Sequence, residues 1–141
     1  WSSGVTAAPD DYALNGGGSI ARNTSAGNVI SGAASAFVTA DVDGNNLAYV
    51  PIWNTYYQGK RIYAEIWLKT STANNSRICI NDGTGETCSA YHVGNGVWAK
   101  SSVIITMNAG ASQLLARVDN NANAATAYID HFICVVADGW R

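Results

Sequence analysis

The residues from Arg61 to Thr70 alternate between two kinds of side chain. Successive side chains of a strand point to opposite faces, so one face would carry only Ile62, Ala64, Ile66 and Leu68. The other face would carry Tyr63, Glu65, Trp67 and Lys69. Flat apolar rings beside hydrogen-bonding groups suit flat-faced, polar-edged ligands, above all sugars, whose C–H bonds pack on a ring while their hydroxyls reach polar neighbours. We therefore interpret Tyr63 and Trp67, with Glu65 beside them, as a candidate sugar-binding platform.

A competing interpretation of this face is structural. A second layer, a loop or a neighbouring subunit could cover the two rings, and large aromatic residues are in any case favourable in strands.

The loop that precedes this strand is rich in aromatic residues, with Trp53, Tyr56 and Tyr57 close together. Connecting loops are usually small and polar, and an exposed aromatic cluster is a liability unless it has a task. Two interpretations stay open: a binding loop at the rim of a sheet, or a hydrophobic plug that closes one end of the fold.

Arg117 is the last candidate for contact with a ligand. It alternates with apolar residues in the segment 113–119, and its guanidinium could donate paired hydrogen bonds to vicinal hydroxyls or to a sugar carboxylate. The alternative, which we favour, is an ion pair within the sheet, with Glu65 or Asp119 as the partner.

Composition limits the class of protein. The chain has 141 residues, 48% of them apolar and only 13% charged, with a net charge of −2. This length fits a single domain, residues 1–141, with a neutral, hydrogen-bonding surface. The absence of a Lys/Arg cluster argues against nucleic acid as a partner, and no run reaches the roughly 18 apolar residues of a membrane helix. The abrupt start at Trp1 is interpreted as that of a module excised from a longer protein, so the lack of a visible signal peptide says little about the parent protein.

The three cysteines do not form a disulfide framework, because their number is odd. Cys79 and Cys88 flank a Gly-rich turn and could bridge a hairpin or remain reduced. Cys134 lies in an apolar strand, where we expect a buried thiol. With only His92 and His131 as histidines, a zinc site is not expected.

Strand signals dominate the chain. Short alternating or β-branched runs are separated by Gly, Asn and Asp turns, the pattern of a sandwich or barrel. The predicted strands are 12–14, 19–23, 34–41, 48–52, 61–70, 76–81, 87–92, 98–107, 113–119 and 125–136. These signals predict an all-β fold and leave the choice between a sandwich and a barrel open.

Five segments in order resemble motifs of jelly-roll carbohydrate-binding modules of the galactose-binding-like superfamily. Residues 59–69 resemble the pattern G-K-x-Y-x-x-S-F-W-V-K, residues 96–103 resemble G-x-W-x-x-x-x-V, and residues 127–132 resemble A-Y-F-D-D-V. Residues 30–35 resemble K-S-G-x-Y-S, and residues 1–12 resemble W-x-x-G followed by P-D-G-W. Domains of this architecture also occur in phage tail and virion proteins.

The resemblance implies an all-β, antiparallel two-sheet β-sandwich of the jelly-roll type. It also implies that the domain binds a polysaccharide or oligosaccharide without catalysis, outside the cell, as a module of a secreted enzyme. The alternative that it implies is a structural assembly or adhesion domain on a virion surface, which could form a homo-oligomer.

The resemblance also implies a structural calcium ion, with Asp130 as side-chain ligand and backbone carbonyls near Ser31 and Gly32. The family's closing Asp-Asp pair is Asp130-His131 here. The residues themselves point the same way, because strict alternation places Asp130 on one face with Tyr128, Phe132 and Cys134. A carboxylate on an apolar face is costly unless it is paired or binds a metal. Capping of backbone N–H groups is the alternative.

The sequence does not predict an enzyme. Glycosidases need two carboxylates about 5–10 Å apart in a cleft, whereas the acidic residues here are scattered and most lie in turns. No G-x-S-x-G elbow and no phosphate-binding loop is present.

Overall fold

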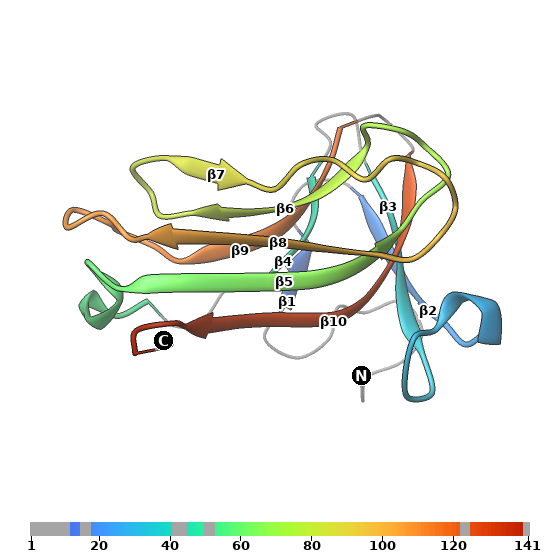
Figure 1. The fold of residues 1–141 in the computed structure, drawn as a ribbon, viewed down its shortest axis with the longest axis horizontal. Coiled ribbons are helices and arrows are strands. Elements are labelled where there is room, and N and C mark those ends of the chain that lie inside the picture. Colours follow the sequence, from blue (N-terminus) through green and yellow to red (C-terminus); the bar gives the residue numbers. More distant parts are fainter. Residues whose placement is uncertain (1–11, 15–17, 41–44, 50–52, 122–124, 140–141) are drawn as a thin grey trace.

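The fold is a sandwich of two five-stranded sheets, described by a computed structural model for residues 12–14, 18–40, 45–49, 53–121 and 125–139 (Figure 1). Sheet A has the strand order β1-β4-β9-β6-β7, and sheet B has the order β2-β3-β10-β5-β8. Every strand pair in both sheets is antiparallel. The predicted all-β, antiparallel two-sheet jelly roll is therefore confirmed.

The ten strands of the described residues follow the predicted ones in order. They are β1 (Tyr12–Leu14), β2 (Ser19–Asn23), β3 (Ser35–Thr39), β4 (Asn45–Tyr49), β5 (Arg61–Lys69), β6 (Ser76–Asn81), β7 (Glu86–Cys88), β8 (Ala99–Thr106), β9 (Leu115–Asn120) and β10 (Thr126–Val136). Two short 3₁₀ turns, η1 (Ala26–Asn28) and η2 (Thr55–Tyr57), lie in the β2–β3 and β4–β5 connections. Among the described residues, no helix is long and apolar enough to cross a membrane.

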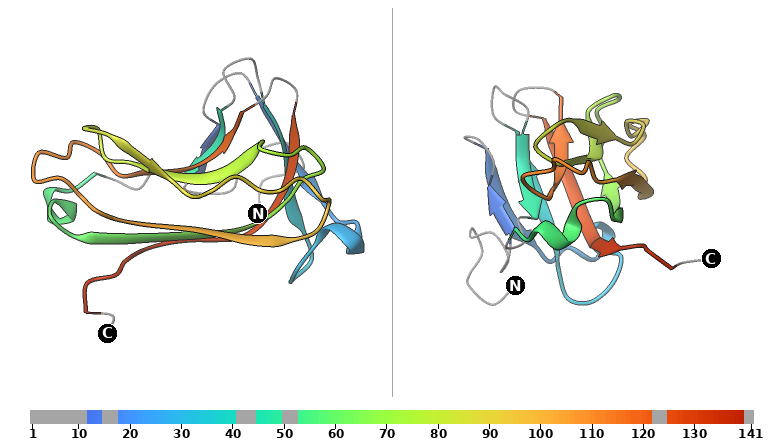
Figure 2. Two further views of the ribbon diagram at one scale, coloured as in Figure 1. Left: turned by 45° about the horizontal axis from the view of Figure 1, so that its top comes forward. Right: turned by 90° about the vertical axis from the view of Figure 1, so that its left-hand side faces the viewer.

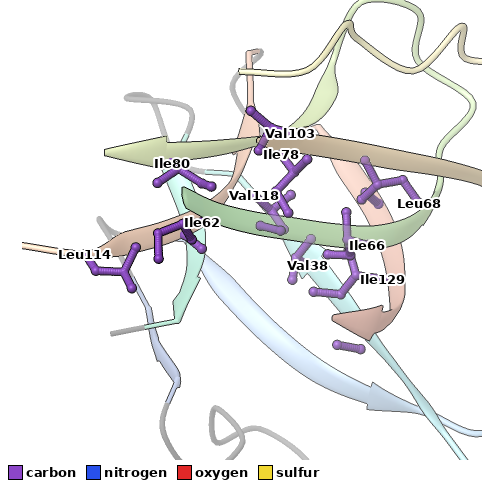
Figure 3. Close-up of a cluster of buried hydrophobic side chains, with 14 of the residues drawn as sticks. Val38, Ile62, Ile66, Leu68, Ile78, Ile80, Val103, Leu114, Val118 and Ile129 are labelled. Atoms are coloured by element: carbon purple, nitrogen blue, oxygen red, sulfur yellow. The ribbon is translucent and has the colours of Figure 1, made fainter. Parts of the chain in front are cut away.

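The core lies between the two sheets and is built from the buried side of each strand. Ile62, Ile66 and Leu68 of β5 have no exposed surface, and neither have Ile78 and Ile80 of β6 in the opposite sheet. Figure 3 shows these side chains interdigitating between the layers. The alternation predicted for residues 61–70 is confirmed along the whole of β5, whose odd-numbered residues are exposed or half-buried.

A β-bulge in β10 interrupts the alternation that the sequence predicts for the last strand, so this prediction is wrong beyond Asp130. Asp130 is paired with Trp67, but the next pair is Ile133 with Glu65, so β10 carries one extra residue there. His131 adopts φ 51° at this point. Beyond the bulge the faces exchange, and Phe132 packs against the core while Ile133 is exposed. Phe132 and Cys134 therefore do not share a face with Tyr128 and Asp130.

The bulge lies where β10 changes partners. The first residues of β10 pair with β3, whereas the residues of β10 beyond the bulge pair only with β5. Figure 1 shows the strand bending between these two neighbours, as a bulged strand does.

Cys79 and Cys88 form a disulfide, which settles the alternative left open by the sequence. The two residues are direct register partners of β6 and β7. Cys134 is free and half-buried against the core, and burial raises the pKa of its thiol to about 11.

The Asp82 side chain fixes the conformation of the β6–β7 turn by hydrogen bonds to the backbone. Its Oδ1 accepts the N–H groups of Thr84 (2.8 Å) and Gly85 (2.9 Å), and its Oδ2 accepts the N–H of Asn108 (3.0 Å). Burial acts to raise the pKa of this carboxyl, but the hydrogen bonds outweigh it and lower the pKa to about 2. The ionised carboxylate thus ties the β6–β7 turn to the β8–β9 connection.

We expect Asp82→Ala to lower the free energy of unfolding at pH 7 by about 2 kcal/mol, the value of a pKa depressed by nearly two units. Because the pKa of Asp82 is lower in the folded than in the unfolded protein, its carboxylate stabilises the fold at pH values above the unfolded pKa, near 4. This stabilisation is lost as the pH falls through the folded pKa of about 2. Denaturant unfolding of both proteins at pH 7 and pH 2 measures the difference. Asp82→Asn is the matched control for volume. If the free energies of unfolding of wild type and Asp82→Ala differ as much at pH 2 as at pH 7, the stabilising role of the ionised Asp82 carboxylate is contradicted.

Candidate functional site

The outer face of sheet B brings three of the predicted ligand residues together. Tyr63, Glu65 and Trp67 are half-buried on the side of β5 that faces away from the core. The register places Glu65 between Ser102 of β8 and Ile133 of β10. Trp67 lies in the same way between Lys100 and Asp130. This surface, which we call the β5 face, is therefore a continuous strip crossing three strands.

A hydrogen-bonded network fixes the polar centre of the β5 face. The Tyr63 hydroxyl donates to Glu65 Oε2 at 2.5 Å, and Lys100 Nζ is 3.1 Å from the same oxygen. The hydrogen bond from Tyr63 lowers the pKa of Glu65, and the same bond raises the pKa of Tyr63. The hydrogen bond to Glu65 likewise raises the pKa of Lys100. At neutral pH the network holds an ionised carboxylate, a neutral phenol and an ammonium group in fixed positions.

A hollow of about 570 Å³ lies beside this network. Tyr63, Glu65 and Lys100 form one side of it, and Ile133, Val135 and Ala137 form the other. The hollow is thus polar where β5 and β8 contribute and aliphatic where β10 contributes.

The β2–β3 connection, residues 24–34, is held against the opposite end of the β5 face. Lys69 Nζ donates to Gly27 O and to Asn28 Oδ1, both at 2.8 Å. Asp130 Oδ2 accepts the N–H groups of Ile30 (2.9 Å) and Ser31 (3.4 Å). Figures 1 and 2 show this connection, drawn in blue around η1, extending from one end of sheet B. The face is therefore bounded near Trp67 by a pinned loop.

Sequence reasoning missed two further aromatic residues of this face, Phe37 of β3 and Tyr128 of β10. They are register partners, and their ring centroids are 4.8 Å apart. Tyr128 is also the partner of Lys69 on β5, which places the ring pair next to the platform residues. The alternation of buried Ala36 and Val38 around Phe37 was a usable signal. The proximity of Phe37 to Tyr128 was not, because pairing of strands distant in sequence is not encoded locally.

The structure does not bring Arg117 to the β5 face. It projects from β9 in sheet A, where its Nη2 donates to Glu86 Oε1 at 2.7 Å. Asp119, one of the expected partners, instead accepts from Arg77 Nε at 2.7 Å. The ion pair within the sheet that the sequence favoured is present, but its partner is Glu86 rather than Glu65 or Asp119.

The three aromatic residues of the loop before β5 do not all fit one interpretation: two fit a hydrophobic plug, and one is exposed. Trp53 and Tyr57 are partly buried against the core, with ring centroids 6.0 Å apart, as expected for a plug. Tyr56 remains 58% exposed, with Lys60 Nζ 5.3 Å from its ring centroid. Among the three, Tyr56 is the one placed to contact a ligand at the rim.

The contacts of Asp130 fit the capping alternative better than a calcium cage. Its Oδ2 faces backbone N–H groups of the loop, and its Oδ1 accepts the N–H of His131 at 2.8 Å. The hydroxyl of Ser31 is hydrogen-bonded to the His131 ring rather than turned toward the carboxylate. Calcium needs about six to eight oxygen ligands, whereas both oxygens of Asp130 already accept N–H donors, from Ile30, Ser31 and His131. No contact joins the predicted backbone ligand Gly32 to this carboxylate among the interactions of the described residues. The calcium ion remains a prediction from the resemblance.

Cys79, Glu86 and Cys88 also lie close enough together to suggest a metal site. The two sulfurs are joined to each other, so the cluster offers no thiolate ligand.

Comparison with known proteins supports the fold. No known protein-family model and no curated protein matches the sequence. The C-terminal family 22 carbohydrate-binding module of Clostridium thermocellum Xyn10B superposes with a TM-score of 0.69 at 16% identity, covering 93% of this chain and 88% of that one. The complex of TmCBM61 with β-1,4-galactotriose gives a TM-score of 0.62 at 12% identity, covering 90% and 89%. The chain has the fold of carbohydrate-binding modules.

The phage alternative also has a structural counterpart. Tailspike protein 4 of bacteriophage CBA120 matches with a TM-score of 0.58 at 12% identity, over 89% of this chain but 19% of the tailspike. The resemblance stated from sequence is confirmed for the fold by these neighbours.

We expect Asp130→Ala to destabilise the protein by about 1 kcal/mol, because the N–H groups of Ile30 and Ser31 in the exposed loop lose their acceptor. Thermal unfolding in EDTA and in millimolar calcium checks both interpretations. A wild-type unfolding temperature that is independent of calcium supports capping. A calcium-dependent rise that disappears in Asp130→Ala would establish the metal site instead.

Proposed function

We propose that this chain is a non-catalytic module that binds a polysaccharide on the β5 face. The observation that carries the proposal is the placement of Tyr63 and Trp67 on the solvent side of one strand, with the Glu65 network between them. Neighbours of the same fold include a xylan-binding domain and a module solved with β-1,4-galactotriose. The fold and the face together support a sugar polymer as ligand.

The geometry of the face explains how a sugar chain could be held. Tyr63 and Trp67 are four residues apart, so their Cα atoms are separated by roughly 13 Å along the strand. Each ring can pack against the C–H face of one sugar, while Glu65 and Lys100 between them reach hydroxyl groups. Because the network is already hydrogen-bonded, these polar groups lose little conformational freedom when the ligand binds.

Binding of this kind is expected to be weak at a single site. We expect a dissociation constant in the micromolar to millimolar range, or roughly −8 to −4 kcal/mol. A parent protein with several such modules would gain through avidity.

The face is poorly suited to hydrolysis of its ligand. A glycosidase needs a second carboxylate acting with the first, whereas the carboxylate next along the face, Asp130, accepts backbone N–H groups through both of its oxygens. Glu65 in turn is held ionised by Tyr63 and Lys100, which does not suit a general acid. A module outside the cell, carried by a secreted enzyme, is the setting that this function implies.

The second candidate is an assembly domain of a phage tail or virion protein. The tailspike neighbour favours it, and so does the apolar patch at one end of sheet B. Ile104 of β8 and Ile133 and Val135 of β10 are all partly exposed there, on the two strands that flank β5. A homo-oligomer would cover such a patch.

The binding proposal predicts that Trp67→Ala weakens binding of xylan or galactan at least tenfold. Stacking of a nucleic-acid base on an aromatic side chain is typically worth about 1–3 kcal/mol. We expect a similar value for a sugar ring that stacks on the Trp67 indole. Isothermal titration calorimetry and affinity electrophoresis with both polymers measure it. Binding that persists unchanged in Trp67→Ala would place the site elsewhere.

Tyr56→Ala is the control that separates the β5 face from the aromatic loop. Tyr56 is exposed, and its ring contacts are with Tyr57 and Lys60 of its own loop, so its removal should change affinity much less than removal of Trp67. A light-scattering mass measurement tests the second candidate, because an oligomer that dissociates in Trp67→Ala would favour assembly over ligand binding.

A further inference from the structure

The hollow on the β5 face has an aliphatic side that stacking on a sugar ring does not use. Ile133 is 42% exposed and Val135 is 37% exposed, and both line the hollow. They reach the outer face only because the bulge at Asp130–Ile133 exchanges the two sides of β10. A branched aliphatic side chain has no flat face for a pyranose, so its partner should be a compact apolar group.

The polar side of the hollow favours an uncharged ligand group. The Glu65 carboxylate is paired with Lys100 at 3.1 Å, so the two charges neutralise each other. A ligand carboxylate entering here would meet Glu65 as well as Lys100. An ammonium group has three N–H donors, and the Lys100 side chain is 50% exposed, so donors remain for a neutral acceptor such as a carbonyl oxygen.

We propose that this hollow accepts a short acyl ester, of which O-acetyl is the smallest, on a sugar bound at the neighbouring platform. The proposal rests on the polysaccharide binding proposed above and specifies which form of the polymer is preferred. The acyl methyl group lies against Ile133 and Val135, and the ester carbonyl accepts a hydrogen bond from Lys100 Nζ. The contact is non-covalent, and the ester is left intact.

The test compares matched polymers that differ only in acylation. The probes are naturally acetylated xylan and the same xylan after mild alkaline deacetylation, with galactan before and after partial chemical acetylation as a second pair. Burial of one methyl group is worth a factor of about four in binding. We therefore expect the acetylated member of a pair to bind at least about fourfold more tightly, measured by calorimetry or affinity electrophoresis.

A double variant locates the preference. Ile133→Thr with Val135→Thr keeps the β-branched shape but replaces apolar groups by hydroxyls, and it should bring both members of a pair to similar affinity. Val97→Thr is the matched control, because Val97 is 59% exposed and does not line the hollow. It should leave the preference unchanged. Thermal unfolding verifies that each variant is folded.

The outcomes separate this inference from the proposed function. Equal binding of both members of a pair overturns the acyl site and leaves polysaccharide binding standing. Failure to bind any of the four polymers overturns the proposed function and the acyl site with it. A preference that survives the double variant overturns the assignment to Ile133 and Val135. A dimer of the wild type that the double variant dissociates would show that a second copy covers the patch, and would also overturn the acyl site.

Discussion

The alternation of side chains along β5 is the constraint on which the rest of the structure depends. Ile62, Ile66 and Leu68 are fully buried, and burial of each is worth about 1.5–3 kcal/mol. A slip of one residue against β8 or β10 would place Glu65 and Lys69 in the core and expose these three side chains. The register is therefore strongly specified, and the outward position of Tyr63 and Trp67 follows directly from it.

The bulge in β10 modifies this regular frame at one place, with several consequences. It leaves Asp130 beside Trp67, where the carboxylate holds the β2–β3 connection through backbone N–H groups. Beyond it, Phe132 turns into the core and Ile133 turns out beside Glu65. The inserted residue thus creates the aliphatic side of the hollow, and it follows directly after the carboxylate that pins the loop at the other end of the β5 face. His131, with its positive φ, is the residue that absorbs the change, at a conformational cost that the surrounding pairing must offset.

The charges of the described residues are largely neutralised in local pairs. Glu65 is paired with Lys100, Arg117 with Glu86 and Arg77 with Asp119. Ion pairs at a surface contribute little stability, about 0–1 kcal/mol each, so their main effect is to hold side chains in one orientation. On the β5 face this leaves an almost neutral, preorganised set of hydrogen-bonding groups between aromatic rings. Such a surface suits a neutral sugar polymer better than a charged partner.

The strands and the inward and outward sides of β5 could be predicted from the sequence, because period-two alternation and Gly/Asn turns are local signals. Tyr63, Glu65 and Trp67 were found for that reason. The faces of β10 were predicted wrongly, since a bulge interrupts the alternation without any composition cue such as glycine; His131 occupies the position of positive φ.

The pairing of distant strands could not be predicted at all. Only the tertiary structure assigned Arg117 to sheet A beside Glu86, brought Lys100 to Glu65 and joined Phe37 to Tyr128. The sequence by itself determined which side chains share a face within an uninterrupted strand such as β5, because covalent geometry fixes that. Which strands lie side by side, and hence what the β5 face contains, depends on how the two sheets bury their apolar sides together.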